Sequence, residues 1–101
     1  MKTSIQIVAD TFLAQIRPIV NDCNQRGALY NYGSITIDLR PAQEAVAFDV
    51  AELYGTFEEY WWQNREAVVE VINAALPRRW VVEDAGKRAD GDTLYTYLAY
   101  K

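Results

Sequence analysis

Hydrophobic residues recur every three to four positions in the first quarter of the chain, which is the periodicity of an amphipathic helix. The stripe consists of Ile5, Val8, Phe12, Ile16, Ile19, Val20 and Cys23. Ser4 can cap the first amides, and Gly27 can take the left-handed conformation that often ends a helix. We predict a helix from Ser4 to Gly27, kinked or split near Pro18, which removes a backbone hydrogen bond. The alternative is a strand over residues 3–8 followed by a helix capped by Asp10.

Hydrophobic and polar residues then alternate along the chain, which predicts a strand, Ser34–Leu39. Ile35, Ile37 and Leu39 share one of its faces. This alternation and the enrichment in β-branched residues are typical of a half-buried strand. Gly33 marks its beginning.

The segment from Pro41 to Tyr54 fits two patterns. As a strand, it places Val46, Phe48 and Val50 on one face. As a helix, it begins at Pro41, ends before Gly55 and leaves Phe48 on its polar side. The apolar stripe of that helix is Ala42, Val46, Val50, Leu53 and Tyr54. We favour the helix because it accounts for more residues.

A stronger helix is predicted from Phe57 to Leu76. Thr56 and Glu59 have the spacing of a capping box, and Pro77 prevents the helix from continuing. One side of this helix is apolar and carries Phe57, Trp61, Val68, Ile72, Ala75 and Leu76.

The C-terminal quarter is predicted to be a β-hairpin. Its strands are Trp80–Glu83 and Thr93–Tyr100, and the turn-forming residues 84–92 make a long tip. We interpret Asp90-Gly91 as a pair of turn-forming residues rather than as part of a calcium site. The fold class is therefore a single small α+β domain, residues 1–101, with the order α-β-α-α-β-β, or α-β-β-α-β-β if segment 41–54 is a strand.

The first of these orders is similar to the order of elements in a winged-helix domain. Residues 49–56 and 86–88 are the local sequence features that support this resemblance. The resemblance implies that the helix beginning at Phe57 reads nucleic acid and that Lys87 and Arg88 lie on the wing. The sequence departs from this pattern at Glu58 and Glu59, whose carboxylates would face phosphates.

The composition of the chain limits the catalytic and metal-binding sites that it can form. The chain has 101 residues, no histidine, one cysteine and a net charge of −4. The absence of histidine excludes serine and cysteine triads and histidine-ligated metals, so we expect no enzyme, cofactor or metal site. Cys23 cannot form an intramolecular disulfide and is interpreted as a packed hydrophobe, which favours a reducing, cytoplasmic location. Neither a signal peptide nor a membrane span is indicated.

Aromatic residues are in excess, at 13% of the chain. Alternation along the last strand places Tyr95 and Tyr97 opposite the apolar face. Trp61 and Trp62 lie about 100° apart on a helix, so at least one of them is marginal or exposed. Exposed tyrosine and tryptophan are enriched at binding hot spots. Alternatively, the two tyrosines make half-buried cross-strand contacts with Val81 and Glu83.

The leading hypothesis is a non-enzymatic, acidic protein-interaction module. Its predicted partner-binding residues are Tyr95, Tyr97, Trp62, Glu58, Glu59, Lys87 and Arg88. One version is an inhibitor of a nucleic-acid-binding protein, of the phage anti-defence or antitoxin type. We expect no nucleic-acid binding at this net charge, and an exposed hairpin edge allows a homodimer.

Two alternatives come from other functional classes. One is a winged-helix nucleic-acid-binding regulator. The other is a small enzyme that uses carboxylate, tyrosine or lysine chemistry in a pocket lined by several of Asp38, Asp49, Glu52 and Tyr54.

Overall fold

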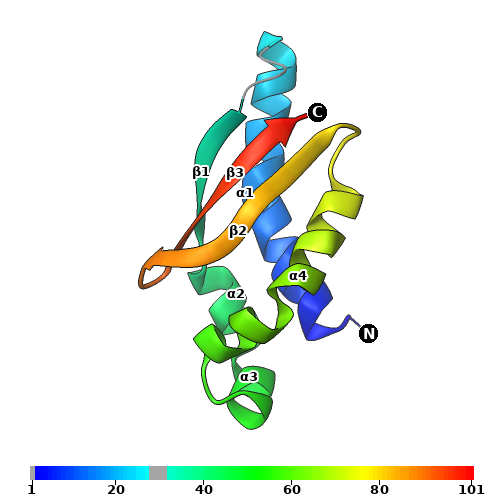
Figure 1. Cartoon of the computed structure of the whole chain (residues 1–101). Coiled ribbons are helices and arrows are strands. Elements are labelled where there is room, and N and C mark those ends of the chain that lie inside the picture. Colours follow the sequence, from blue (N-terminus) through cyan, green and yellow to red (C-terminus); the bar gives the residue numbers. More distant parts are fainter. Residues whose placement is uncertain (1, 28–31) are drawn as a thin grey trace.

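The computed structural model describes residues 2–27 and 32–101, and it describes their side chains except at 32 and 84–90. The elements in chain order are α1 (Ser4–Arg26), β1 (Tyr32–Asp38), α2 (Arg40–Ala45), α3 (Ala47–Leu53), α4 (Phe57–Ala75), β2 (Trp80–Asp90) and β3 (Thr93–Tyr100) (Figure 1). The small α+β domain with a C-terminal hairpin is confirmed. The order that carried the winged-helix resemblance is present, with one additional short helix.

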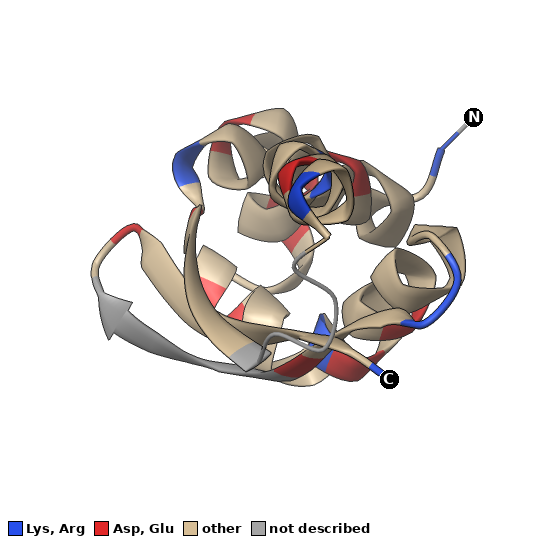
Figure 2. Ribbon diagram, turned by 90° about the horizontal axis from the view of Figure 1, so that it is seen from above, with Lys and Arg blue, Asp and Glu red and all other residues tan. Residues whose placement is uncertain are grey.

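The three strands form an antiparallel sheet in the order β1-β3-β2, so the last strand is central. Viewed from above, the sheet forms one layer and the helices the other (Figure 2). Apolar side chains of both layers meet in one core. Its largest fully buried side chains include Phe12 and Ile16 of α1, Tyr60 and Trp61 of α4, and Leu94 of β3.

Helix α1 is continuous from Ser4 to Arg26, so the prediction that Pro18 splits it is wrong. Pro18 and Ala14, whose carbonyl loses its intrahelical partner, are both exposed, and water can satisfy that carbonyl. The capping residue is Thr3 rather than Ser4, because the Gln6 amide donates to Thr3 Oγ1 over 3.2 Å. Gly27 ends the helix in the left-handed conformation, as predicted, with φ 67°.

Segment 41–54 is helical, as we favoured, but it forms two short helices rather than one. The backbone leaves helical geometry at Val46, where φ is −118° and ψ is 17°. Because the helix is interrupted there, the side chains of α3 do not continue the helical periodicity of α2. Ala42 and Val50 are buried as predicted, whereas Leu53 is 74% exposed and does not belong to the apolar stripe. Phe48 is 73% exposed.

Helix α4 confirms the predicted capping, since the Glu59 amide donates to Thr56 Oγ1 over 3.2 Å. The sequence pattern missed Tyr60, which is buried and donates through its hydroxyl to Ser4 Oγ over 3.3 Å. Burial raises the pKa of Tyr60 above its usual value. This contact ties the start of α4 to the start of α1.

The predicted long hairpin tip is wrong, because β2 runs on to Asp90 and the turn lies around Gly91. Pairing with β3 overrides the local turn propensity of these residues. The register shifts between Glu83, which pairs with Tyr97, and Lys87, which pairs with Tyr95. In this stretch β2 therefore has more residues than β3, and the additional residues form an irregularity within the strand.

Candidate functional site

Tyr95 and Tyr97 lie on the outer face of the sheet, which the helices do not cover. They are 46% and 39% exposed, whereas Leu94, Thr96 and Leu98 between and beside them point into the core. The predicted division of β3 into two faces is therefore confirmed. The buried Thr96 hydroxyl donates to the Glu83 carbonyl over 2.6 Å, which satisfies the polar group on the apolar side.

The strands beside β3 bring short side chains next to these tyrosines. Ser34 of β1 pairs with Tyr97, and Thr36 pairs with Tyr95; both are exposed. On the other side, Glu83 of β2 pairs with Tyr97 and forms an ion pair with Lys101. Small hydroxyl side chains on one flank leave the two rings standing above the surface, and a charged pair lies at the edge.

The start of α4 presents a second surface. Glu58 and Glu59 are exposed in its first turn. Trp62 is 50% exposed, with the Arg65 guanidinium 4.8 Å from its ring centroid, whereas Trp61 is buried. The prediction that at least one of the two tryptophans is marginal or exposed is confirmed. Carboxylates, an indole and a cation share one stretch of helix.

The structure does not gather all seven predicted binding residues into one patch. The two tyrosines lie on the outer face of the sheet, and Glu58, Glu59 and Trp62 lie on α4 in the other layer. The side chains of Lys87 and Arg88 lie outside the described residues.

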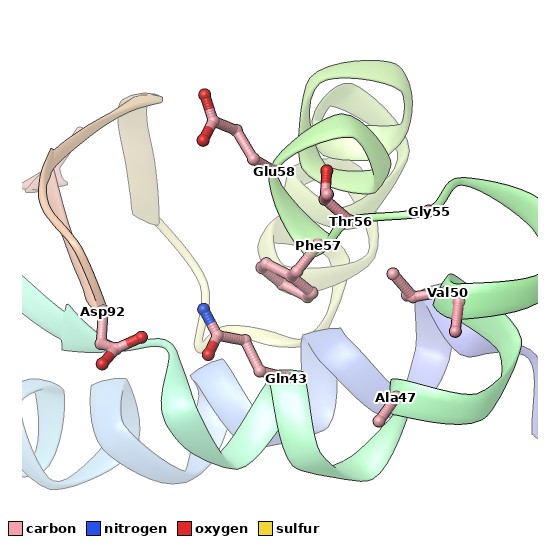
Figure 3. A pocket seen from close by; sticks show the side chains of 9 residues that line it. Gln43, Ala47, Val50, Gly55, Thr56, Phe57, Glu58 and Asp92 are labelled. Atoms are coloured by element: carbon pink, nitrogen blue, oxygen red, sulfur yellow. The ribbon is translucent and has the colours of Figure 1, made fainter.

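The hairpin turn nevertheless meets the start of α4 at an open pocket of about 420 Å³. The pocket is lined by Gln43, Ala47, Val50, Ala51, Gly55, Thr56, Phe57, Glu58 and Asp92 (Figure 3). Of these, Glu58 is one of the predicted binding residues. Gln43 and Asp92 were missed because no local pattern links residues so far apart in the chain.

A second open pocket, of about 530 Å³, lies at the end of the sheet beside the hairpin turn. Here the Asp38 carboxylate accepts hydrogen bonds from Arg40 Nε over 3.0 Å and from Nη2 over 2.8 Å. Hydrogen bonding to this guanidinium lowers the pKa of Asp38 below its usual value, and the carboxylate raises the pKa of Arg40. The pair is a charged, bidentate surface contact.

Of the four residues considered for a catalytic pocket, Asp38 lines the second pocket, and none of the four lines the first. Asp49 and Glu52 are exposed on α3. The Tyr54 ring packs edge-on against Tyr60, with centroids 5.1 Å apart.

Cys23 is partly buried against the core, as expected for a small packed side chain. Glu66 and Glu70 are exposed on α4. None of the described helices combines the length and apolar character needed to cross a membrane. No protein-family model, curated protein or solved structure matches this chain.

Proposed function

We propose that this protein is a non-enzymatic interaction module that binds a protein partner through the outer face of its sheet. The observation that carries the proposal is the exposure of Tyr95 and Tyr97, side by side on the central strand. Core packing does not require these rings, because the same strand already supplies Leu94 and Leu98 to the core.

The local geometry suits a tyrosine-based contact. Successive side chains on one face of a strand lie about 7 Å apart, so two rings form a compact apolar unit with hydroxyls at its edge. Ser34 and Thr36 are too short to cover them. Tyrosine buries a large area at low conformational cost, which explains its enrichment at hot spots of interfaces.

The test is affinity capture from the native host, comparing the wild type with Tyr95→Ala/Tyr97→Ala and with Phe48→Ala. Phe48 is a matched control because it is 73% exposed and lies on α3, in the helical layer. We expect the wild type and the Phe48 variant to retain a protein that the double variant loses. We also expect the melting temperature of the double variant to lie within a few degrees of that of the wild type. Equal retention by all three proteins contradicts the proposal.

A second candidate partner class is a nucleic-acid-binding protein that this chain inhibits. Its support is the exposed side of α4, where Glu59, Glu66 and Glu70 stand beside Trp62. A row of carboxylates on a rigid helix complements a groove lined by lysine and arginine. This candidate predicts that the captured protein loses nucleic-acid binding when the complex forms.

A further inference from the structure

Strand β1 is an edge strand, and no other described strand lies along its outer side (Figure 1). At Asp38 the backbone amide and carbonyl bond to the Gln15 side chain on α1. The amide of the next residue, Leu39, instead donates to the Asp92 carbonyl, just before β3, over 2.7 Å. Because this direction alternates along an antiparallel strand, odd-numbered residues of β1 bond to β3 and even-numbered residues face outward.

Two residues, Ser34 and Thr36, thus present backbone amide and carbonyl groups to the outer edge. Both residues are exposed, and the described residues offer no hydrogen-bond partner to these outward groups. No charged residue or proline occurs from residue 32 to residue 37, and the pairing of β1 with β3 has no register shift. Charges, prolines and bulges are the usual means of blocking an edge strand. This edge is therefore open to another strand.

The other edge of the sheet is better protected. Strand β2 has register shifts in its pairing with β3, and Asn73 of α4 bonds to both backbone groups of Val82. A homodimer through the hairpin would use this side, since the outer strand of the hairpin is β2. Strand β1 is the edge better suited to pairing.

We propose that β1 pairs antiparallel with β1 of a second copy of this chain, across a two-fold axis at Ile35. This register places Ser34 opposite Thr36 of the second copy, so that the two symmetry-related pairs form four backbone hydrogen bonds. The pairing ends before Asp38, whose backbone groups are already bonded to a side chain of α1. The chain has a net charge of −4, and two such copies approach most readily through an uncharged stretch, which β1 supplies.

The side chains suit this pairing. Ile35 is half-buried against the core, and the two copies of Ile35 meet at the axis, where a non-hydrogen-bonded pair brings side chains closest. On the other face Ser34 and Thr36 are short and uncharged, so the strands can approach. The contact uses residues 33–37 of each copy, far fewer than the roughly 20–30 residues per side of a standard interface, so the dimer is weak and concentration-dependent. It also places the tyrosine pairs of both copies on one continuous face.

The first test measures self-association of the whole chain. Sedimentation velocity from micromolar to millimolar concentrations is combined with hydrogen exchange of the Ser34 and Thr36 amides. We expect an equilibrium between monomer and dimer, and slower exchange of both amides as the dimer forms. A monomer at every concentration, or assemblies larger than a dimer, overturn the proposal. Amide protection that does not change with concentration also overturns it, because the partner then lies within the same chain.

The second test removes one outward N–H group. Thr36→Pro leaves the hydrogen bonds between β1 and β3 intact, because the Thr36 amide points away from β3. The two-fold axis doubles its effect, so we expect the dissociation constant of the dimer to rise about tenfold or more. An unchanged dissociation constant in a variant that circular dichroism shows to be folded overturns the proposal. If this variant does not fold, the charge variants of the third test decide.

The third test exchanges charge across the axis. We expect Ser34→Lys/Thr36→Lys and Ser34→Glu/Thr36→Glu to be monomeric alone, because like charges lie opposite one another, and to form a heterodimer when mixed. The matched control is Gln63→Lys/Ala74→Lys, which adds the same charge as the first variant at exposed positions of α4 and retains the dimer. Loss of the dimer in this control, or no heterodimer in the mixture, overturns the proposal.

Discussion

At the residue scale, two buried tryptophans differ in whether the indole nitrogen has a hydrogen-bond partner among the described residues. Trp80 is 2% exposed, and its indole nitrogen donates to Asn24 Oδ1 over 3.1 Å. Trp61 is 1% exposed, packs against Phe12 with centroids 5.5 Å apart, and has no hydrogen-bond partner for its indole nitrogen within the described part of the chain. An unsatisfied buried donor costs about 1–3 kcal/mol. Trp61 therefore stabilises the core by packing alone.

We predict that Trp80→Phe destabilises the protein more than Trp61→Phe, by roughly 1–3 kcal/mol, as measured by urea denaturation. Both substitutions remove a similar volume from the core. The change at Trp80 also breaks a hydrogen bond, whereas the change at Trp61 removes an unsatisfied donor. A larger loss for Trp61→Phe would show that its indole nitrogen is satisfied in solution.

At the element scale, helix side chains protect both edges of the sheet. From α1, Gln15 donates to the Asp38 carbonyl and accepts from the Asp38 amide, each over 2.8 Å. From α4, Asn73 donates to the Val82 carbonyl over 3.3 Å and accepts from the Val82 amide over 2.8 Å. Each amide group thus pairs with an edge strand as a neighbouring strand would. These contacts also fix the helical layer relative to the sheet.

We predict that Asn73→Ala accelerates hydrogen exchange of the Val82 amide and leaves Asp38 unchanged, and that Gln15→Ala has the converse effect. Each variant is the control for the other. Each loses about 1–3 kcal/mol of stability because two edge backbone groups lose their partners. Unchanged exchange at both amides would show that these side chains do not protect the edge strands.

At the scale of the whole molecule, charge and topology favour different kinds of partner. The order of elements, with one additional short helix, is the order on which the winged-helix resemblance was based, and that resemblance implies that α4 reads nucleic acid. Its exposed side, however, carries Glu58, Glu59, Glu66 and Glu70. These residues and a net charge of −4 oppose the phosphate contacts that supply most non-specific affinity for DNA.

We predict that the protein does not bind a mixed-sequence DNA duplex at about 50 mM salt, as measured by fluorescence anisotropy. The control is a salt titration, because phosphate contacts weaken steeply as salt rises. Binding at low salt that declines with added salt would instead support the winged-helix alternative.

Much of the local structure was predictable because local interactions specify it. Thr56 caps α4 and Gly27 ends α1 through contacts within a few residues. The predictions failed where distant parts of the chain decide. Val46 interrupts the helical segment, and the tail of β2 extends to Asp90 by pairing with β3. The buried Tyr60 escaped detection because it faces α1, which no periodicity within α4 reveals.

The sequence by itself determined most of the elements, the cap of α4 at Thr56 and the separation of Tyr95 and Tyr97 from the apolar face of the last strand, because backbone periodicity fixes which side chains share a face. The tertiary structure alone decided that helices cover only one face of the sheet and that Asp92 and Glu58 line the same pocket. Those outcomes depend on packing between elements distant in the sequence, where the burial of a common core sets the arrangement.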